Sequence, residues 1–119
     1  MTLTIRFANG AEMPYLAATE TEEYWGGASR RTLTFQLART AAGLDALDAL
    51  CSEENLARLE LCNAEAGITG IHEGYCLKLK LAVERVLADS EKQLYEERIV
   101  LKLGKRTFIE QQLHKLGLA

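Results

Sequence analysis

The chain has 119 residues, a length that suits one domain of residues 1–119 with a modest hydrophobic core. Its 14 basic and 17 acidic side chains are interspersed and give a net charge of −3, so we expect no nucleic-acid partner. No stretch reaches the roughly 18 apolar residues of a membrane span, and the N-terminus lacks the pattern of a signal peptide. We therefore expect a cytoplasmic protein with no membrane partner.

The first segment has the two-residue period of a β-hairpin. In residues 3–7, apolar side chains alternate with polar ones, as in a strand. Asn9-Gly10 follows and is the strongest short signal for a hairpin turn. The return strand is expected over residues 11–18. Pro14 has no N–H to donate, so this strand should lie at a sheet edge or carry a bulge.

Residues 19–31 are polar and predict a loop that contains the single tryptophan of the chain. Tyr24 and Trp25 precede two glycines, which give the segment freedom to adapt. The tryptophan ring either caps the edge of the core beside a turn or lies in a binding loop, where exposed aromatic residues are enriched. Tyr24 and Trp25 are therefore candidate interface residues.

A third strand is predicted over residues 32–37, where large apolar residues alternate with threonines and a glutamine. Arg30 and Arg31 precede it. They either pair with the glutamates of the preceding segment or are solvated. The choice between these alternatives depends on how residues 19–31 fold.

The period changes to that of a helix at residue 41. Leucines then recur every three or four residues, which predicts a short amphipathic helix that ends within residues 52–55. Asp45 and Asp48 lie on its other face. Without further ligands nearby, they indicate a solvated surface rather than a metal site or an acid–base pair.

Residues 56–62 fit two structures. Apolar and charged residues alternate as in a strand, but Leu56 and Leu59 would also share one face of a helix. The alternation favours the strand. Residues 63–73 contain two glycines and predict a loop, with a short extended piece at residues 68–71.

The longest regular pattern spans residues 74–104 and predicts a β-hairpin around the polar loop 89–93. Placing Ala88 opposite Leu94 brings apolar residues together and pairs opposite charges, whereas a shift by one residue does not. Only Lys80 opposite Lys102 is unfavourable in this register. The favourable opposite pairs are Leu79 with Leu103, Leu81 with Leu101, Val83 with Ile99, Leu87 with Tyr95, Arg85 with Glu97 and Glu84 with Arg98.

This hairpin is longer than a small domain needs. Strands of about 13 residues span roughly 43 Å, which is about twice the usual strand length. We therefore predict that the distal half, residues 82–100, projects from the body and binds a partner or another copy. Alternatively, the hairpin curls over its own domain and residues 3–18 cover it. The candidate interface residues of this half are Val83, Leu87, Tyr95 and Ile99.

The pattern at the C-terminal end predicts a second helix. Thr107 followed by Glu110 fits a capping box, and Gly117 suits the position after the last turn. Its apolar stripe consists of Phe108, Ile109, Leu113 and Leu116.

Few residues suggest chemistry. Cys51, Cys62 and Cys76 are odd in number and not closely spaced, so we expect reduced cysteines that pack as small hydrophobes. Cys62, His72 and Cys76 lack the spacing and the fourth ligand of a zinc site. There is no phosphate-binding loop, positioned nucleophile–base pair or carboxylate pair. We expect no catalytic residues, no metal and no cofactor, and therefore no enzyme.

The order of the predicted elements resembles the domain of tailed-phage tail and baseplate proteins, such as tail-tube and distal-tail subunits. The resemblance covers residues 31–103. It includes a strand with Arg-Thr-Leu-Thr-Phe, a short leucine-rich helix, the strand at residues 56–62, and Gly74-Tyr75 opening a long strand pair. In that family, two sheets with a flanking helix form rings, and a long hairpin or arm reaches neighbouring subunits. The helix after residue 107 and the lack of a second domain depart from its better-known members.

These patterns predict an α+β fold, mainly antiparallel sheet in a sandwich or open barrel, with a long C-terminal hairpin and two short helices. The resemblance implies a structural or assembly protein of a phage or prophage tail, associated with the virion. Its partners would be copies of itself or other phage structural proteins. A small cytoplasmic adaptor that binds through Tyr24-Trp25 and the hairpin is an alternative. A ligand-binding or enzymatic domain whose site forms only in three dimensions is another.

Overall fold

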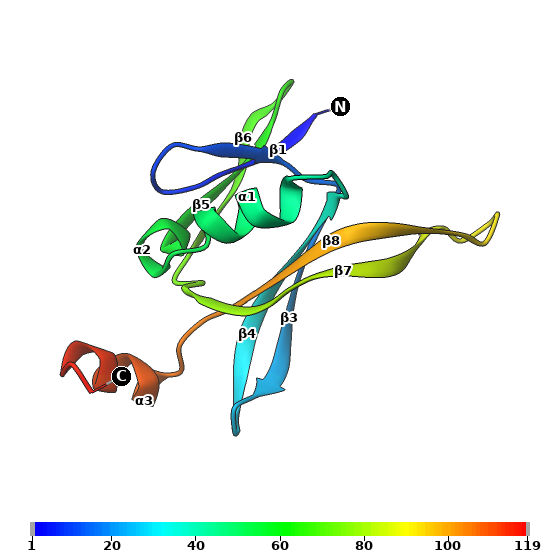
Figure 1. Cartoon of the computed structure of the whole chain (residues 1–119). Coiled ribbons are helices and arrows are strands. Elements are labelled where there is room, and N and C mark those ends of the chain that lie inside the picture. The colour runs from blue at the N-terminus through cyan, green and yellow to red at the C-terminus, as the bar shows by residue number, and fades with distance from the viewer. Residues whose placement is uncertain (1, 119) are drawn as a thin grey trace.

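The chain forms two four-stranded antiparallel sheets and three short helices over residues 2–118, the part that the computed structural model describes (Figure 1). This confirms the α+β class with mainly antiparallel sheet. The strands are β1 (Leu3–Arg6), β2 (Glu12–Pro14), β3 (Ala17–Trp25), β4 (Ala28–Ala38), β5 (Arg58–Asn63), β6 (Gly67–Glu73), β7 (Leu77–Asp89) and β8 (Leu94–Gly104). The helices are α1 (Gly43–Leu50), α2 (Glu53–Leu56) and α3 (Phe108–Lys115).

The first sheet has the order β2-β1-β5-β6 and begins with the hairpin predicted at Asn9-Gly10. Gly10 has a φ of +88°, a conformation that glycine adopts without steric cost. Pro14 belongs to β2, the edge strand of the sheet, and lies opposite Thr4 of β1. The edge position predicted from the missing N–H is therefore confirmed.

The predicted return strand over residues 11–18 is divided between the two sheets. The backbone N–H of Tyr15 donates to the carbonyl of Leu3 in the first sheet, over 3.0 Å. The next N–H, of Leu16, donates to the carbonyl of Gln36 in the second sheet, over 2.7 Å. The chain thus passes from one sheet to the other within two residues.

Residues 19–31 form a β-hairpin rather than the predicted loop. β3 pairs with β4 from Ala17 opposite Gln36 to Trp25 opposite Ala28. The turn between them is Gly26-Gly27, with φ values of +59° and +82°. A two-residue hairpin turn with positive φ at both positions matches the twist of the flanking strands, and glycine suits it best.

Three helices form where two were predicted. α1 agrees with the predicted amphipathic helix, and its Leu47 is buried. Residues 52–55 do not simply end it, because Ser52 caps the extra helix α2 through a 3.2 Å hydrogen bond from the N–H of Asn55 to its Oγ. The predicted strand over residues 56–62 is present as β5, with Leu56 in α2. The expected loop over residues 63–73 is largely the strand β6.

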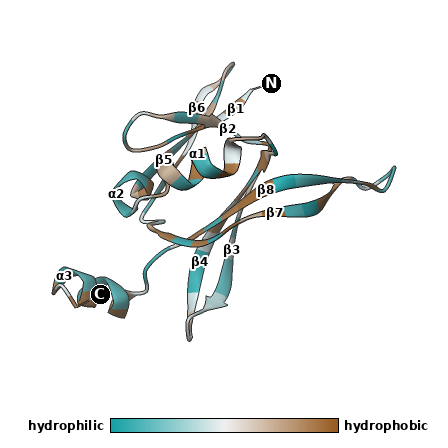
Figure 2. Ribbon diagram, viewed as in Figure 1, coloured by the Kyte–Doolittle hydropathy of each residue, from teal (hydrophilic) through white to brown (hydrophobic). Residues whose placement is uncertain are grey.

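One buried cluster takes side chains from both sheets, from α1 and α2, and from the segments that connect them. It includes the half of the long hairpin next to the body, where β7 and β8 are brown in Figure 2. Burying each large apolar side chain contributes roughly 1.5–3 kcal/mol. The members are Ile5, Phe7, Tyr15, Leu33, Phe35, Leu37, Leu47, Leu56, Leu59, Tyr75, Ile99, Leu101 and Leu103.

Candidate interaction surface

The long hairpin leaves the body beyond Arg98. The last pair between β4 and β8 joins Ala38 to Arg98. Further out, β8 pairs with β7 alone among the described residues, as far as Leu94. We call residues 84–97 the β7–β8 arm, and Figure 1 shows it extending away from both sheets. Projection begins further out than the predicted residues 82–100, because β8 stays paired with β4 up to Arg98.

The predicted register of the hairpin is correct from Lys80 to Leu87 and differs at both ends. Near the body, a bulge places Lys78 opposite Leu103, so Leu79 does not face it as predicted. At the tip, Asp89 rather than Ala88 faces Leu94. The Asp89 carboxylate accepts hydrogen bonds from the backbone N–H groups of Glu91, over 3.0 Å, and Lys92, over 3.1 Å. These hydrogen bonds organise the turn.

One face of the arm is partly apolar and open to solvent. Leu87 and Tyr95 lie opposite each other and are 48% and 53% exposed. Arg85 follows on the same face, with its guanidinium carbon 4.9 Å from the centre of the Tyr95 ring, a cation–π contact. Val83 is also exposed and lies where the arm meets the body. The structure thus brings together three of the four residues predicted for this surface.

Ile99 does not belong to the exposed surface. It is only 2% exposed and pairs with Leu37 of β4 as part of the buried cluster. Its parity along β8 is the same as that of Tyr95, but β4 accompanies β8 at this point. Ile99 therefore anchors the base of the arm.

Tyr24 and Trp25 lie at the other end of the second sheet. They end β3, where Tyr24 faces Ser29, whereas the arm begins near Ala38 at the opposite end of β4. The Tyr24 ring is exposed, and Trp25 is half-buried with the Lys102 ammonium 5.5 Å from its ring centre. The pair lies in a strand rather than a loop and is separate from the arm.

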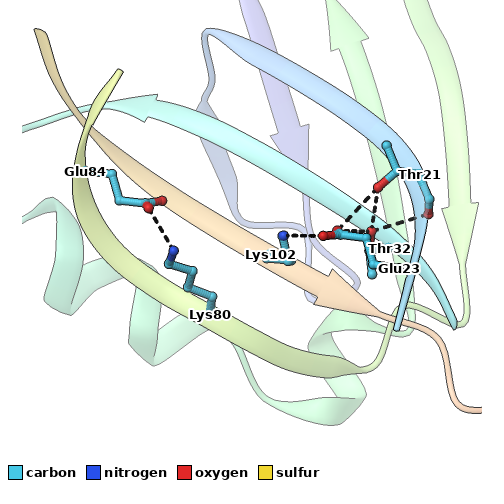
Figure 3. A network of polar contacts seen from close by, with 6 residues as sticks. All are labelled: Thr21, Glu23, Thr32, Lys80, Glu84 and Lys102. Atoms are coloured by element: carbon cyan, nitrogen blue, oxygen red, sulfur yellow. Dashed lines mark hydrogen bonds and ion pairs between the residues drawn. The ribbon is translucent and has the colours of Figure 1, made fainter. Parts of the chain in front are cut away.

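The two opposed lysines of the hairpin are each neutralised by a different carboxylate (Figure 3). Lys80 donates to Glu84 over 2.7 Å, and Lys102 donates to Glu23 of β3 over 2.9 Å. Glu23 also accepts a 2.8 Å hydrogen bond from the buried hydroxyl of Thr32. These hydrogen bonds, led by that from Lys102, lower the pKa of Glu23. The predicted lysine–lysine repulsion is thereby offset.

Glu20 is the centre of a second polar cluster. It accepts hydrogen bonds from the Tyr75 hydroxyl and the Arg31 guanidinium, both over 2.6 Å, and lies 3.2 Å from His72 Nδ1. The Tyr75 bond first, and then the Arg31 bond, lower the pKa of Glu20 to about 2. A carboxylate with such a pKa is a weak base. The cluster therefore fits a joint between β3 and the start of the long hairpin better than a catalytic site.

The cysteines lie apart and are half-buried, and each is a free thiol. Burial raises the pKa of Cys51 to about 11. Cys62 and His72 are on β5 and β6, and Cys76 lies next to Arg106, whose guanidinium is 2.7 Å from its sulfur. Within residues 2–118, no group of three or more His, Cys, Asp or Glu side chains could hold a metal ion. No described helix is long and apolar enough to cross a membrane.

Two further apolar features were not anticipated from the sequence. The capping box at Thr107 and Glu110 is present as predicted, but the apolar stripe of α3 faces solvent rather than the core.

Separately, an apolar groove of about 160 Å³ lies where the chain crosses between the sheets. Its lining residues are distant in sequence, and only the fold brings them together. They include Met13, Tyr15, Leu16, Leu37, Ala38 and Ile99.

The fold and these surfaces describe a two-sheet α+β protein with a projecting β-ribbon arm. Comparison with known proteins gave no match to a family model, a curated protein or a solved structure. The likeness to phage tail proteins therefore rests on the order of the elements.

Proposed function

We propose that this chain is a non-enzymatic structural or assembly protein of a phage or prophage tail. It acts by self-association, and the β7–β8 arm carries the contact. One observation supports this most: residues 84–97 project as a two-stranded ribbon with an apolar, solvent-exposed face. The element order that resembles tail proteins supports the setting in a virion.

The energetics of the arm favour a binding role. An isolated two-stranded hairpin is at best marginally stable in water. Covering the half-exposed side chains of Leu87 and Tyr95 on a neighbour would gain roughly 1 kcal/mol each. β7 is also an edge strand of 13 residues, whose outward N–H and C=O groups can pair with another strand.

The arm alone does not yield tight binding, because association costs about 4–15 kcal/mol in lost freedom of motion. A closed ring overcomes this cost by giving each copy two contacts, and symmetric closed assemblies are common. We therefore expect association that depends strongly on protein concentration. Intermediate species should be scarce once rings close.

Point substitutions on the arm test the proposal without removing it. Leu87→Ser/Tyr95→Ser should reduce association at least about tenfold, since exposed aromatic and apolar anchors dominate many interfaces. The matched control is Lys92→Ser, an exposed residue at the arm tip. Size-exclusion chromatography with light scattering measures the molar mass over a range of concentrations. Equal association of the Leu87→Ser/Tyr95→Ser variant and the wild type would contradict the proposal.

A small cytoplasmic adaptor is the second candidate, favoured by the exposed Tyr24 far from the arm. This alternative predicts a chain that stays monomeric at every concentration. A small-molecule ligand-binding domain has less support. The apolar groove holds about 160 Å³, whereas ligand sites usually enclose roughly 300–1,000 Å³. A larger hollow of about 360 Å³ is lined by charged side chains such as Asp48 and Lys78, which already pair with each other.

A further inference from the structure

Strand β7 is the longest edge strand of the described chain. Residues 2–118 form two sheets with four edge strands, which are β2, β3, β6 and β7. β7 has 13 residues, whereas β6 has seven and β2 has three. β3 carries Glu20, Glu22 and Glu23, so two antiparallel copies of it would bring like charges together. β7 is therefore the edge that is best suited to pairing with a second copy of itself.

The charges along β7 lie symmetrically about Ala82 and are opposite in sign. Lys80 precedes Ala82 by two residues and Glu84 follows it by two, so the three side chains share one face of the sheet. Within one chain, Lys80 Nζ lies 2.7 Å from Glu84 Oε1 (Figure 3). Four residues of strand span roughly 13 Å, so these side chains have to bend toward each other. A second β7, antiparallel and with its Ala82 opposite the first, would place each Lys80 directly opposite a Glu84.

The other two-fold registers of two β7 strands are less favourable. A two-fold axis at Lys80 or at Glu84 would place two like charges opposite each other. An axis at Leu81 or at Val83 would leave Lys80 opposite an apolar residue. With the axis at Ala82, both charges are paired and Leu81 lies opposite Val83. The sequence of β7 therefore favours the register that is centred on Ala82.

A charged hollow adjoins the free edge of β7. It has a volume of about 360 Å³, and its lining comes from α1 and from residues 78–81 of β7, with no residue of β8. Asp48 of α1 pairs there with Lys78. Asp45, which also lines the hollow, is exposed and forms no ion pair with another residue between 2 and 118. The hollow therefore offers one carboxylate to a cation from outside.

Arg85 of a second copy would supply this cation. In the same register, Arg85 of one strand lies beside Leu79 of the other, and Leu79 lines the hollow. Arg85 shares a face of β7 with Leu81, which is another lining residue. Within its own chain, Arg85 contacts the Tyr95 ring but forms no ion pair with a residue between 2 and 118. Pairing of two β7 strands would thus bring an unpaired guanidinium to an unpaired carboxylate, Asp45, at two equivalent places.

We propose that β7 of one copy pairs antiparallel with β7 of a second copy about a two-fold axis at Ala82, which joins two four-stranded sheets into one continuous sheet. Lys80 then lies opposite Glu84, and Arg85 faces Asp45, in both directions, as two-fold symmetry requires. The inference rests on the proposed self-association and specifies how the arm is used. Each copy gives its arm and receives that of its partner, so the smallest closed assembly is a dimer.

A cysteine cross-link reads the register directly. Ala82→Cys places two thiols at the axis, with Cα atoms roughly 4.5–5.5 Å apart, a separation that suits a disulfide. Val86→Cys is the matched control on the same strand and face, because its two copies would lie roughly 26 Å apart. Full-length chains are treated with oxidised glutathione, and non-reducing electrophoresis measures the dimer. Ala82→Cys should cross-link at least about tenfold faster than Val86→Cys or the wild type, which reports on the native cysteines.

Charge reversal separates pairing between chains from the ion pair within one chain. Lys80→Glu makes both positions acidic and Glu84→Lys makes both basic, so each variant alone would place like charges opposite each other. In sedimentation velocity, each alone should associate at least about tenfold more weakly than the wild type. An equimolar mixture should recover association. Neither variant retains the ion pair within its own chain, so this recovery comes from contact between chains. Lys92→Glu at the exposed arm tip is the control and should associate normally.

Circular dichroism checks that every variant is folded. Equal cross-linking of Ala82→Cys and Val86→Cys would overturn the proposal. A mixture of Lys80→Glu and Glu84→Lys that associates no better than its components would also overturn it.

The arm variant Leu87→Ser/Tyr95→Ser separates this inference from the proposed function. If the arm variant loses association and Ala82→Cys does not cross-link, the arm proposal stands and the β7 contact is overturned. If Ala82→Cys cross-links and the arm variant associates normally, the β7 contact stands and the arm proposal fails. A wild-type chain that is monomeric at all concentrations, with no cross-link in Ala82→Cys, overturns both.

Discussion

Arg30 and Glu110 form a two-pronged ion pair that joins β4 to α3, with 2.7 Å between Nη1 and Oε1 and 2.9 Å between Nη2 and Oε2. The Arg30 side chain is almost fully buried, whereas that of Glu110 is 39% exposed. Glu110 is the carboxylate that pairs with Arg30 among the described residues, and the Nε of Arg30 is buried there without a hydrogen-bond partner. This pair orients α3 and so controls which side of the helix faces solvent.

Glu110→Gln should destabilise the chain by about 1–3 kcal/mol, because it leaves the buried Arg30 charge without its anion. The cost is below that of breaking a fully buried pair, since water partly screens Glu110. Urea unfolding measures the change in the free energy of unfolding. Glu91→Gln at the arm tip is the control and should be neutral. A Glu110→Gln variant as stable as this control would show that the ion pair is not needed.

Acid should weaken the same region within a defined range of pH. The Arg30 hydrogen bond, followed by the backbone bond from Thr107, lowers the pKa of Glu110 from the ordinary 4.5 to about 2. Ionised Glu110 therefore stabilises the folded chain fully above pH 4.5, and this contribution is lost as the pH falls toward 2. The Glu110→Gln variant should lose less stability than the wild type between pH 4.5 and 2. Parallel losses in urea unfolding would contradict this prediction.

Tyr75 should control the ionisation of Glu20. Its hydroxyl provides the largest contribution to the low pKa of Glu20, and burial raises its own pKa to about 12. Tyr75→Phe should therefore raise the pKa of Glu20 from about 2 toward 4.5, with Arg31 retaining part of the shift. NMR titration of the Glu20 carboxyl carbon measures the change. Tyr24→Phe at an exposed ring is the control, and an unchanged Glu20 pKa in Tyr75→Phe would rule out this role of the hydroxyl.

Gly104 should be difficult to replace. A Cβ at this position would lie 2.8 Å from Leu79 Cδ1 and 2.9 Å from Arg30 Cδ, distances at which a neighbour must move. We expect Gly104→Ala to cost about 1–3 kcal/mol, as for other overpacked sites. Gly70→Ala is the control, because its nearest neighbour would be 3.7 Å away. Equal unfolding midpoints for the two variants would contradict this account.

The same glycine lies beside a part of the hairpin whose register was not predicted. Pairing of apolar residues and opposite charges predicted the hairpin register from Lys80 to Leu87 correctly. The bulge between Lys78 and Lys80 departs from that pattern, and the Leu79 side chain there lies against Gly104, which has no Cβ. β3 was missed because most of its side chains are exposed and polar, which hides the two-residue period. α2, with four residues, is too short to show a helical period.

The candidate surfaces, like the fold, were only partly predictable from the sequence. Val83, Leu87 and Tyr95 share a face because of the two-residue period, which is a local property. Ile99 shares that parity but is buried in the cluster, which β8 reaches only by pairing with β4, a contact between residues far apart in sequence. The stripe of α3 was also correct in composition. Its direction was not predictable, because it depends on Arg30, which lies 80 residues before Glu110.

If the arm carries self-association, a chain with a shortened arm should lose it. Replacing residues 85–97 with Asn-Gly joins Glu84 to Arg98 through a two-residue turn and leaves the buried cluster intact. Sedimentation equilibrium then compares both chains over a range of concentrations. We predict that the mass of the wild type rises above the monomer mass of 13.2 kDa, while the folded, shortened chain associates far more weakly. A wild type that stays at the monomer mass, or a shortened chain that associates equally well, would contradict the claim.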